Sequence, residues 1–305
     1  MRKVLRNEQL ESEFQKEGFV KIDFLGSEEV ETLKQKFFEL IPNSGGLLSS
    51  EDLGVEKSKE VDCDIDFTFI DSNIEFKRNV FDAIVEVFTP FYESVLEDYV
   101  PIIANFIRKK NKGGEVPLHQ NWAFIDETKA TSVSIWCPLV DMDEENGTLQ
   151  FVPGSHKRYG KVRGPMIPWE LQGIKDQIIQ NDLVPMMMKA GQAVVLDDSV
   201  LHYSDINKTD NLRLAIQLIL IPKELYSIHY HMNPAVNNKK VNVIQADTEF
   251  YMEFNPWKQP QDPKIIKTFD YQPFEMTYDE YKAKLYKRRY DEPNNIFEKL
   301  KAVFT

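Results

Sequence analysis

Short segments of alternating hydrophobic and polar residues dominate the middle of the chain. In residues 212–222, leucine and isoleucine occupy every second position and a mixed set occupies the positions between them. The apolar set is Leu214, Ile216, Leu218 and Leu220, and the mixed set is Arg213, Ala215, Gln217 and Ile219. Successive side chains of a strand point to opposite faces, so this spacing predicts a strand with one fully apolar face.

Residues 132–139 show the same alternation with a polar side. Ser132, Ser134 and Trp136 fall on one predicted face, and Val133, Ile135, Cys137 and Leu139 fall on the other. Turn pairs such as Asn146-Gly147 and Pro153-Gly154 separate the short strands between residues 101 and 222. This region therefore has the pattern of a β barrel or jelly roll, with a polar-lined pocket on the serine side of residues 132–139.

The first hundred residues are predicted to be largely helical after one opening strand. Ser27 is expected to cap a helix whose buried stripe is Val30, Leu33, Phe37, Leu40 and Ile41. A second helix is predicted over residues 74–99, with a kink at Pro90. Residues 43–66 are predicted to be a loop, which is either a flap over a site or simply mobile.

These patterns predict a single domain over residues 1–305, mainly β with helical additions. Residues 1–100 would form an N-terminal helical layer, residues 101–222 the jelly-roll core and residues 223–305 a C-terminal extension. The extension contains a candidate helix at residues 279–289. It is expected either to cover the substrate pocket or to form a homodimer contact.

Composition restricts the partners. The formal net charge is -12, which argues against nucleic acid or an anionic membrane as the main partner, because both require a basic surface. Residues 1–17 are charged throughout, and the longest apolar run, 214–222, is broken by Gln217. Two cysteines, Cys63 and Cys137, are too few for a disulfide framework, and Cys137 is expected in the core. We therefore expect a cytoplasmic protein with a small-molecule partner.

Two histidines and an asparagine are the candidate metal ligands. His119 and Asn121 are two residues apart in a predicted strand, so both side chains can reach one ion. His202 would come from a later strand, within residues 192–203. Two histidines and one carboxylate on one face of Fe(II) leave positions for cosubstrate and oxygen. Here an amide stands where that carboxylate is expected, which places one negative charge fewer at the metal.

Arg213 is the candidate anion-binding residue. Its planar guanidinium suits a carboxylate held in two contacts, as a dicarboxylate cosubstrate would provide. The alternative is that Arg213 pairs with one of the protein's own acidic side chains. Together with both histidines, the anion-binding interpretation is the stronger one. The basic run of Arg108, Lys109, Lys110 and Lys112 is interpreted as solvated charge, although a lysine at 109 or 110 could approach the cosubstrate.

At this point the chain resembles the phytanoyl-CoA dioxygenase family of iron and 2-oxoglutarate dependent oxygenases. Residues 13–24 are similar to the family's opening strand, and residues 118–122 are similar to its H-Q-D segment, with Asn121 in place of Asp. Residues 145–156, E-N-G-T-L-Q-F-V-P-G-S-H, are very close to its central signature. The spacing from His202 to Ser204 and Arg213 also fits. The resemblance covers roughly residues 10–222.

The resemblance implies a double-stranded β-helix, or jelly roll, with Fe(II), 2-oxoglutarate and O2 as cofactor and cosubstrates. His119 and His202 would be iron ligands, with Asn121 on or near the metal. Arg213 and Ser204 would hold the distal carboxylate of 2-oxoglutarate, and Trp136 would lie against it. The implied reaction is hydroxylation, desaturation, cyclisation or halogenation of a small metabolite, an amino-acid derivative or a natural-product intermediate.

Asn121 leaves three interpretations open: a natural variant with persisting or altered chemistry, a laboratory change from Asp, and a non-catalytic relative. A neighbouring carboxylate, Asp126 or Asp198, could substitute for the missing one. Two rival functions are a regulatory jelly-roll protein with a vestigial metal pocket and a cupin-like isomerase or hydrolase that needs no oxygen. No second metal site is assigned to His229 and His231, because no carboxylate or cysteine lies beside them.

Overall fold

The fold is built on a six-stranded antiparallel sheet, which we call the major sheet. The computed structural model describes residues 2–43, 65–109, 112–232, 239–256 and 258–291. The major sheet has the order β1-β8-β5-β10-β3-β2. Its strands are β1 (Phe19–Asp23), β8 (Gln192–Asp197), β5 (Val133–Pro138), β10 (Arg213–Pro222), β3 (Tyr99–Lys109) and β2 (Ile65–Phe67).

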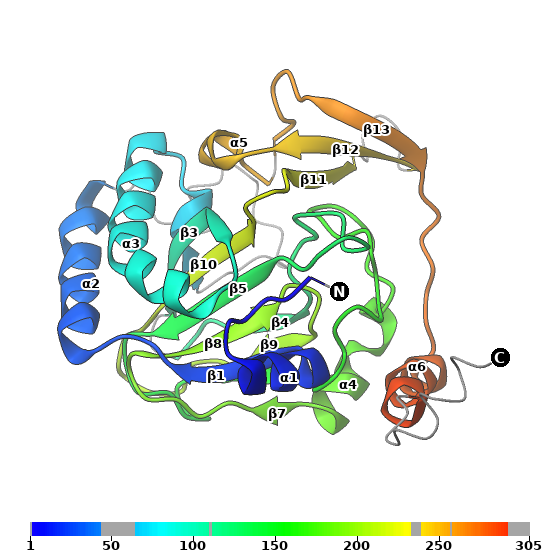
Figure 1. Cartoon of the computed structure of the whole chain (residues 1–305), viewed down its shortest axis with the longest axis horizontal. Helices are drawn as coiled ribbons and strands as arrows, with labels where there is room; N and C mark the ends of the chain where they lie inside the picture. Colours follow the sequence, from blue (N-terminus) through cyan, green and yellow to red (C-terminus); the bar gives the residue numbers. More distant parts are fainter. Residues whose placement is uncertain (1, 44–64, 110–111, 233–238, 257, 292–305) are drawn as a thin grey trace.

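Three helices from the first hundred residues cover one face of the major sheet. They are α1 (Glu8–Glu17), α2 (Ser27–Leu40) and α3 (Ile74–Val95), with short 3-10 turns at Ile41–Asn43 and Thr68–Ile70. Figure 1 shows α2 and α3 side by side against the sheet. The apolar residues of β5 and β10 pack there with the helices, as their alternation predicts; the strand members are Val133, Ile135, Cys137, Leu214, Ile216, Leu218 and Leu220.

Two details of the helices differ from the prediction. The N-cap of α2 is Gly26 and makes no side-chain capping bond, so Ser27 is the first helical residue rather than the cap. The second helix begins at Ile74 as predicted and contains Pro90, but it ends at Val95, because Tyr99 already belongs to β3. The predicted loop over residues 43–66, with Cys63, falls almost entirely outside the described residues.

A second antiparallel sheet, the minor sheet, faces the other side of the major sheet. Its order is β4-β9-β6-β7, formed by β4 (Val116–His119), β9 (His202–Ser204), β6 (Leu149–Phe151) and β7 (Val184–Pro185). The two sheets enclose a second apolar cluster that includes Trp136, Phe151 and Ala215. The jelly-roll fold is thus confirmed, although the described strands form two facing sheets rather than one closed hydrogen-bonded barrel.

The C-terminal residues form a sheet of their own, which the sequence pattern did not predict. Strands β11 (Ser227–Met232), β12 (Lys240–Ala246) and β13 (Ile265–Asp270) pair in that order, and α5 (Thr248–Glu253) follows β12. The predicted C-terminal helix is confirmed as α6 (Tyr278–Asp291). It packs outside the minor sheet, near 3-10 turn Gln172–Ile174 and α4 (Lys175–Asn181). In Figure 1 the third sheet lies above the jelly roll and α6 lies at the lower right.

No helix in the described part of the chain is both long enough and apolar enough to span a membrane.

Candidate functional site

Strand register brings the two histidines together. His119, the last residue of β4, is the direct cross-strand partner of His202, the first residue of β9. Their ring centroids are 4.2 Å apart. Asn121 lies two residues beyond His119, just past the end of β4 rather than within the strand as predicted. All three side chains line one cavity of about 280 Å³ between the sheets.

Each imidazole is oriented by a backbone carbonyl. Nδ1 of His119 lies 2.7 Å from the carbonyl oxygen of Pro117, and Nδ1 of His202 lies 2.9 Å from that of Val200. A carbonyl oxygen only accepts hydrogen bonds, so Nδ1 carries the hydrogen in both rings and Nε2 keeps its lone pair. Burial lowers the pKa of both histidines, His202 most strongly, which favours the neutral form that binds metals. The pair is therefore ready to ligate a divalent cation.

The Asn121 side chain is held in one orientation by the hydrogen bonds that its amide nitrogen donates. Nδ2 donates to Oδ1 of Asp198 at 2.9 Å and to Oγ of Ser134 at 3.1 Å. Because the nitrogen is used by Asp198 and Ser134, the amide oxygen is the atom left to face the imidazoles. An amide oxygen can ligate a divalent cation, but it brings no charge.

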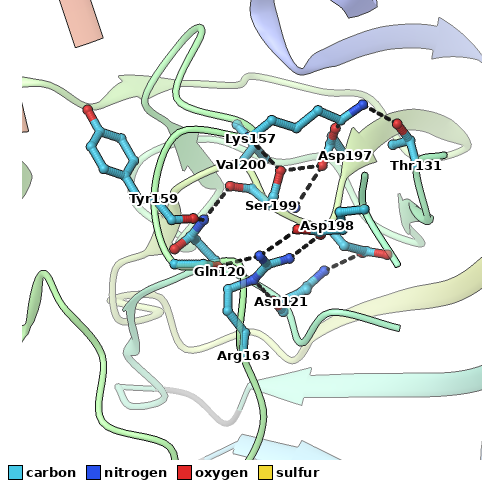
Figure 2. Close-up of polar contacts among 12 residues, drawn as sticks. Gln120, Asn121, Thr131, Lys157, Tyr159, Arg163, Asp197, Asp198, Ser199 and Val200 are labelled. Carbon is cyan, nitrogen blue, oxygen red and sulfur yellow. Dashed lines mark hydrogen bonds and ion pairs between the residues drawn. The ribbon is translucent and has the colours of Figure 1, made fainter. Parts of the chain in front are cut away.

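Asp198 is a fully buried carboxylate behind Asn121, and Figure 2 shows the two residues among their polar neighbours. Ser134 donates to the same oxygen, Oδ1, at 2.6 Å. Burial raises the pKa of Asp198 to about 7, against the hydrogen bonds from Ser134 and Asn121, which lower it. Asp126, the other carboxylate considered from sequence, instead caps a turn at Thr128 and pairs with Lys129. Of these two carboxylates, only Asp198 contacts Asn121.

Arg213 lies at the other end of the same cavity and is buried, with 1% of its surface exposed. Nη2 donates to the carbonyl of Gly147 at 3.0 Å and to Oγ of Ser204 at 3.2 Å, whereas Nε and Nη1 have no hydrogen-bond partner. The guanidinium lies 5.1 Å from the centre of the Trp136 ring. Burial lowers the pKa of Arg213 to about 9. No carboxylate of the described residues forms an ion pair with it, so an external anion is the better interpretation.

Lys109 was interpreted from sequence as part of a solvated basic run, and this was wrong. It is fully buried, and it is the cross-strand partner of Arg213 on β3. Nζ donates to the carbonyl of Asp205 at 2.5 Å and to Oγ of Ser204 at 2.5 Å. Burial and then the nearby guanidinium lower the pKa of Lys109 to about 6. Lys109 is therefore a second basic group beside Arg213, held in place by Ser204 and Asp205.

The rest of the basic run is compensated elsewhere. Arg108 points to the opposite face of β3 and pairs with Asp66, and Lys112 pairs with Asp210 at 2.9 Å. Lys110 lies outside the described residues. The period-two alternation of β3 carries a signal that sequence reasoning missed, since it places Lys109 on the same face as Ile107 and Ile103, both of which line the cavity.

The remaining cavity wall is apolar. Aromatic and aliphatic side chains from both sheets, their connections and the C-terminal region form it, namely Phe67, Phe69, Ile70, Ile103, Ile107, Val116, Trp122, Phe124, Leu149, Leu196, Ile219 and Pro256. Gln217 adds a polar point on this wall and hydrogen bonds Ser134 at 3.3 Å. Arg213 is the one side chain with a formal charge among the described residues that line the cavity.

The other histidines and Cys137 lie in packed surroundings. His229 is buried in β11 among Trp122, Phe250 and Phe254, with ring centroids 5.0–5.6 Å away. Its neighbour His231 stacks on it at 6.3 Å. No group of three or more histidine, cysteine or acidic side chains in the described part of the chain is arranged to hold a metal. Cys137 is buried in the core, as predicted.

Known proteins share parts of this sequence and its fold. A family profile described as "Phytanoyl-CoA dioxygenase (PhyH)" matches residues 14–215. The chain belongs to the phytanoyl-CoA dioxygenase family. A homolog of phytanoyl-CoA dioxygenase domain-containing protein 1 from Dictyostelium discoideum is 33% identical over 147 residues, which is 46% of this chain and 52% of that protein. Phytanoyl-CoA dioxygenase 1 from Oryza sativa subsp. japonica is 33% identical over 37% of this chain and 41% of its own. The matched stretches thus span about half, or less, of these relatives.

Two solved structures have the same fold at low sequence identity. The epimerase SnoN, in complex with Fe3+, alpha ketoglutarate and nogalamycin RO, matches 90% of this chain and 96% of its own at a TM-score of 0.55 and 18% identity. The carbocyclase SnoK from nogalamycin biosynthesis matches 73% of this chain and 86% of its own at a TM-score of 0.53 and 15% identity. These likenesses support the jelly-roll architecture of the family.

Proposed function

We propose that the chain is a non-haem Fe(II)- and 2-oxoglutarate-dependent oxygenase that oxidises a small, uncharged, largely apolar molecule. The observation that carries the proposal is the pairing, in one cavity, of two carbonyl-oriented imidazoles with a buried guanidinium that has two unpartnered nitrogens. The first arrangement suits a divalent metal and the second a carboxylate. Family membership points to the same chemistry.

His119, His202 and the amide oxygen of Asn121 are the proposed iron ligands. Bound Fe(II) supplies oxygen activation, in which 2-oxoglutarate and O2 are converted to succinate and CO2 while one oxygen atom oxidises the substrate. The protein holds the reactants in place. The Nδ1 hydrogen bonds to Pro117 and Val200 keep both rings neutral and correctly turned. The surrounding apolar wall excludes water from the reacting atoms.

The distal carboxylate of 2-oxoglutarate is proposed to bind Nε and Nη1 of Arg213. Ser204 lies against both basic residues and orients them, and Trp136 forms the adjacent wall. Lys109 adds a second basic group, which sequence reasoning left out. The carboxylate would find the two unpartnered nitrogens of Arg213 already desolvated, so little reorganisation accompanies binding.

The substrate is proposed to occupy the apolar part of the cavity. Among its described lining residues, none besides Arg213 carries a charge, so a carboxylate or phosphate group of a substrate has no counter-ion there. Gln217 and Trp122 offer points for hydrogen bonding and stacking. The structure of SnoN in complex with nogalamycin RO makes a natural-product intermediate a reasonable substrate class.

The C-terminal residues are proposed to cover this substrate region, as part of one functional unit over residues 1–305. Pro256 lines the cavity, and the ring of Phe254 packs on Trp122 at a centroid distance of 5.3 Å. Tyr251 of α5 completes the contact by packing against Phe124. The cavity therefore depends on the C-terminal region as well as on the two sheets of the jelly roll.

An anaerobic titration tests the proposal. Adding Fe(II) and then 2-oxoglutarate should produce the weak visible charge-transfer band of the chelate, and admitting O2 should release succinate. Binding of metal and cosubstrate without succinate release would favour the regulatory alternative. Product formation that requires metal but no oxygen would favour an isomerase or hydrolase.

A further inference from the structure

We propose that Asp198 provides, from behind Asn121, the negative charge that the metal site lacks at position 121, so that the two residues act as one ligand unit. Asn121 would contribute the ligating oxygen, and Asp198 would be a positioning residue that orients and polarises it. The inference rests on the proposed function, because it concerns the same metal site.

The geometry fixes the amide in one orientation. Asn121 Nδ2, Ser134 Oγ and Asp198 Oδ1 form a closed triangle with sides of 2.9, 3.1 and 2.6 Å. A carboxylate oxygen only accepts, so the nitrogen of the amide must be the atom that faces Asp198. The backbone is held as well, because Nε of Arg163 donates to the carbonyl oxygen of Asn121 at 2.7 Å. The amide oxygen is consequently left on the side of the imidazoles.

Asp198 is one of two adjacent buried carboxylates, and among the described residues the other, Asp197, is the one with an ion-pair partner. Asp197 lies 3.5 Å from the ammonium of Lys157, and Figure 2 shows this second group beside Asp198. Asp198 has no such ion pair with a described side chain, although it is fully buried. Arg163 forms its ion pair with Glu127, and its guanidinium also acts through space on Asp197 and Asp198. Buried charges in proteins are paired or serve a metal, and a cation held by Asn121 and the two histidines would be the missing partner.

A carboxylate hydrogen bonded to an amide N–H draws electron density toward the carbonyl oxygen. Hydrogen bonds in a chain polarise one another in this way, and low-dielectric surroundings strengthen the effect. The cation would therefore be attracted by a more negative ligand oxygen and also by the charge of Asp198, which lies behind Asn121. Outer partners of this kind typically account for about 10–100-fold in metal affinity.

This arrangement changes what Asn121→Asp is expected to do. The substitution by itself would place two carboxylates at the 2.9 Å contact now made by the amide. Like charges at that distance repel each other, which opposes a carboxylate at position 121 as long as Asp198 is present. Restoring the family's usual residue at 121 should therefore help only when the charge at 198 is removed at the same time.

A four-protein cycle tests the proposal: wild type, D198N, N121D and N121D/D198N. Co(II) affinity of the metal-free proteins is measured by calorimetry, and the visible absorption of bound Co(II) reports coordination, so no turnover is needed. We expect D198N to weaken Co(II) binding by about 10–100-fold in the wild-type background. In the N121D background the same change should leave affinity unchanged or raise it. This reversal would show that the negative charge near the metal can be supplied from either position 121 or position 198.

Asp197→Asn is the matched control, since it removes a neighbouring buried carboxylate that pairs with Lys157 instead. It should leave Co(II) affinity near the wild-type value. If D198N does not fold, the comparison of N121D with N121D/D198N still decides the matter, because the double variant must bind Co(II) at least as tightly as N121D.

An equal loss of Co(II) affinity on D198N substitution in both backgrounds would show that Asp198 only supports the fold, and would overturn the inference. Unchanged affinity in D198N would overturn it too, while leaving the proposed oxygenase intact. A wild-type protein that binds neither Co(II) nor Fe(II) would instead remove the metal site itself, and with it both proposals.

Discussion

Replacing Arg213 by methionine should separate cosubstrate binding from folding stability, and the two should change in opposite directions. Methionine has similar length and packs well against Trp136, but it has no charge and no donors. The substitution leaves few polar groups without partners. The carbonyl of Gly147, which Arg213 contacts, also accepts a hydrogen bond from Oγ of Ser204 at 2.7 Å.

The magnitude follows from the two unpartnered nitrogens, Nε and Nη1. Each charge-assisted hydrogen bond to a carboxylate contributes about 1.5–3 kcal/mol, so two contribute about 3–6 kcal/mol. At about 1.4 kcal/mol per tenfold change, 2-oxoglutarate should bind roughly 10²–10⁴-fold more weakly to R213M. The protein without cosubstrate should become more stable by on the order of 1–3 kcal/mol, because an unsatisfied buried cation is removed.

Calorimetric titration of 2-oxoglutarate into the metal-loaded protein measures the first effect. Urea unfolding of the protein without metal or cosubstrate, followed by far-ultraviolet circular dichroism, measures the second. Arg213→Lys is the control that keeps the charge and loses the planar fork, and its affinity should fall between wild type and R213M. Unchanged 2-oxoglutarate affinity in R213M would remove Arg213 from the anion site. A marked loss of stability would show that the guanidinium is satisfied within the fold.

Three further predictions address the remaining parts of the site. Burial and Arg213 lower the pKa of Lys109 to about 6, and a bound dicarboxylate would raise it. Cosubstrate binding should therefore take up a proton and strengthen as the pH falls from about 8 to about 6. Proton uptake makes the calorimetric binding enthalpy depend on the buffer, and K109M should abolish this dependence. An equal dependence in K109M and wild type would contradict the prediction. H119A and H202A should each lose bound Fe(II), measured by metal analysis. The urea unfolding midpoint of the metal-free variants should stay close to that of the wild type, because metal stabilises the folded state by mass action. Wild-type metal content in either variant would exclude that residue as a ligand. Ile219→Glu should weaken binding of the neutral dye Nile red, measured by fluorescence, with 2-oxoglutarate affinity unchanged; unaltered dye binding would place the apolar site elsewhere.

The alternation of hydrophobic and polar residues was sufficient to predict which side chains share a face of each central strand. Alternation placed Leu218 and Arg213 on opposite faces of one strand, and in the structure Leu218 packs with the helices while Arg213 lines the cavity. The same reasoning placed Trp136 on the cavity side of β5. These assignments succeed because the side-chain period of a strand is set by backbone geometry, so a residue's face depends only on its position within the strand.

The candidate site residues were also recognisable from sequence, because their spacing within short motifs is itself local information. His119 and Asn121 are two residues apart, and Ser204 follows His202 by two. The similarity of residues 145–156 to the central signature of the phytanoyl-CoA dioxygenase family then indicated the family whose site residues these could be. None of this required knowledge of how the strands pair.

Tertiary structure alone decided which groups meet. The pairing of His119 with His202 depends on the register between β4 and β9, whose members are some eighty residues apart in the chain. Lys109 faces Arg213 because β3 and β10 pair in one register out of several that local sequence allows. Asp198 reaches Asn121 from the turn that directly follows β8, 77 residues further along the chain. Strand register and the burial of a charge arise from contacts between distant segments, so a periodic pattern can assign a side chain to a face of its strand but not to the partner it meets there.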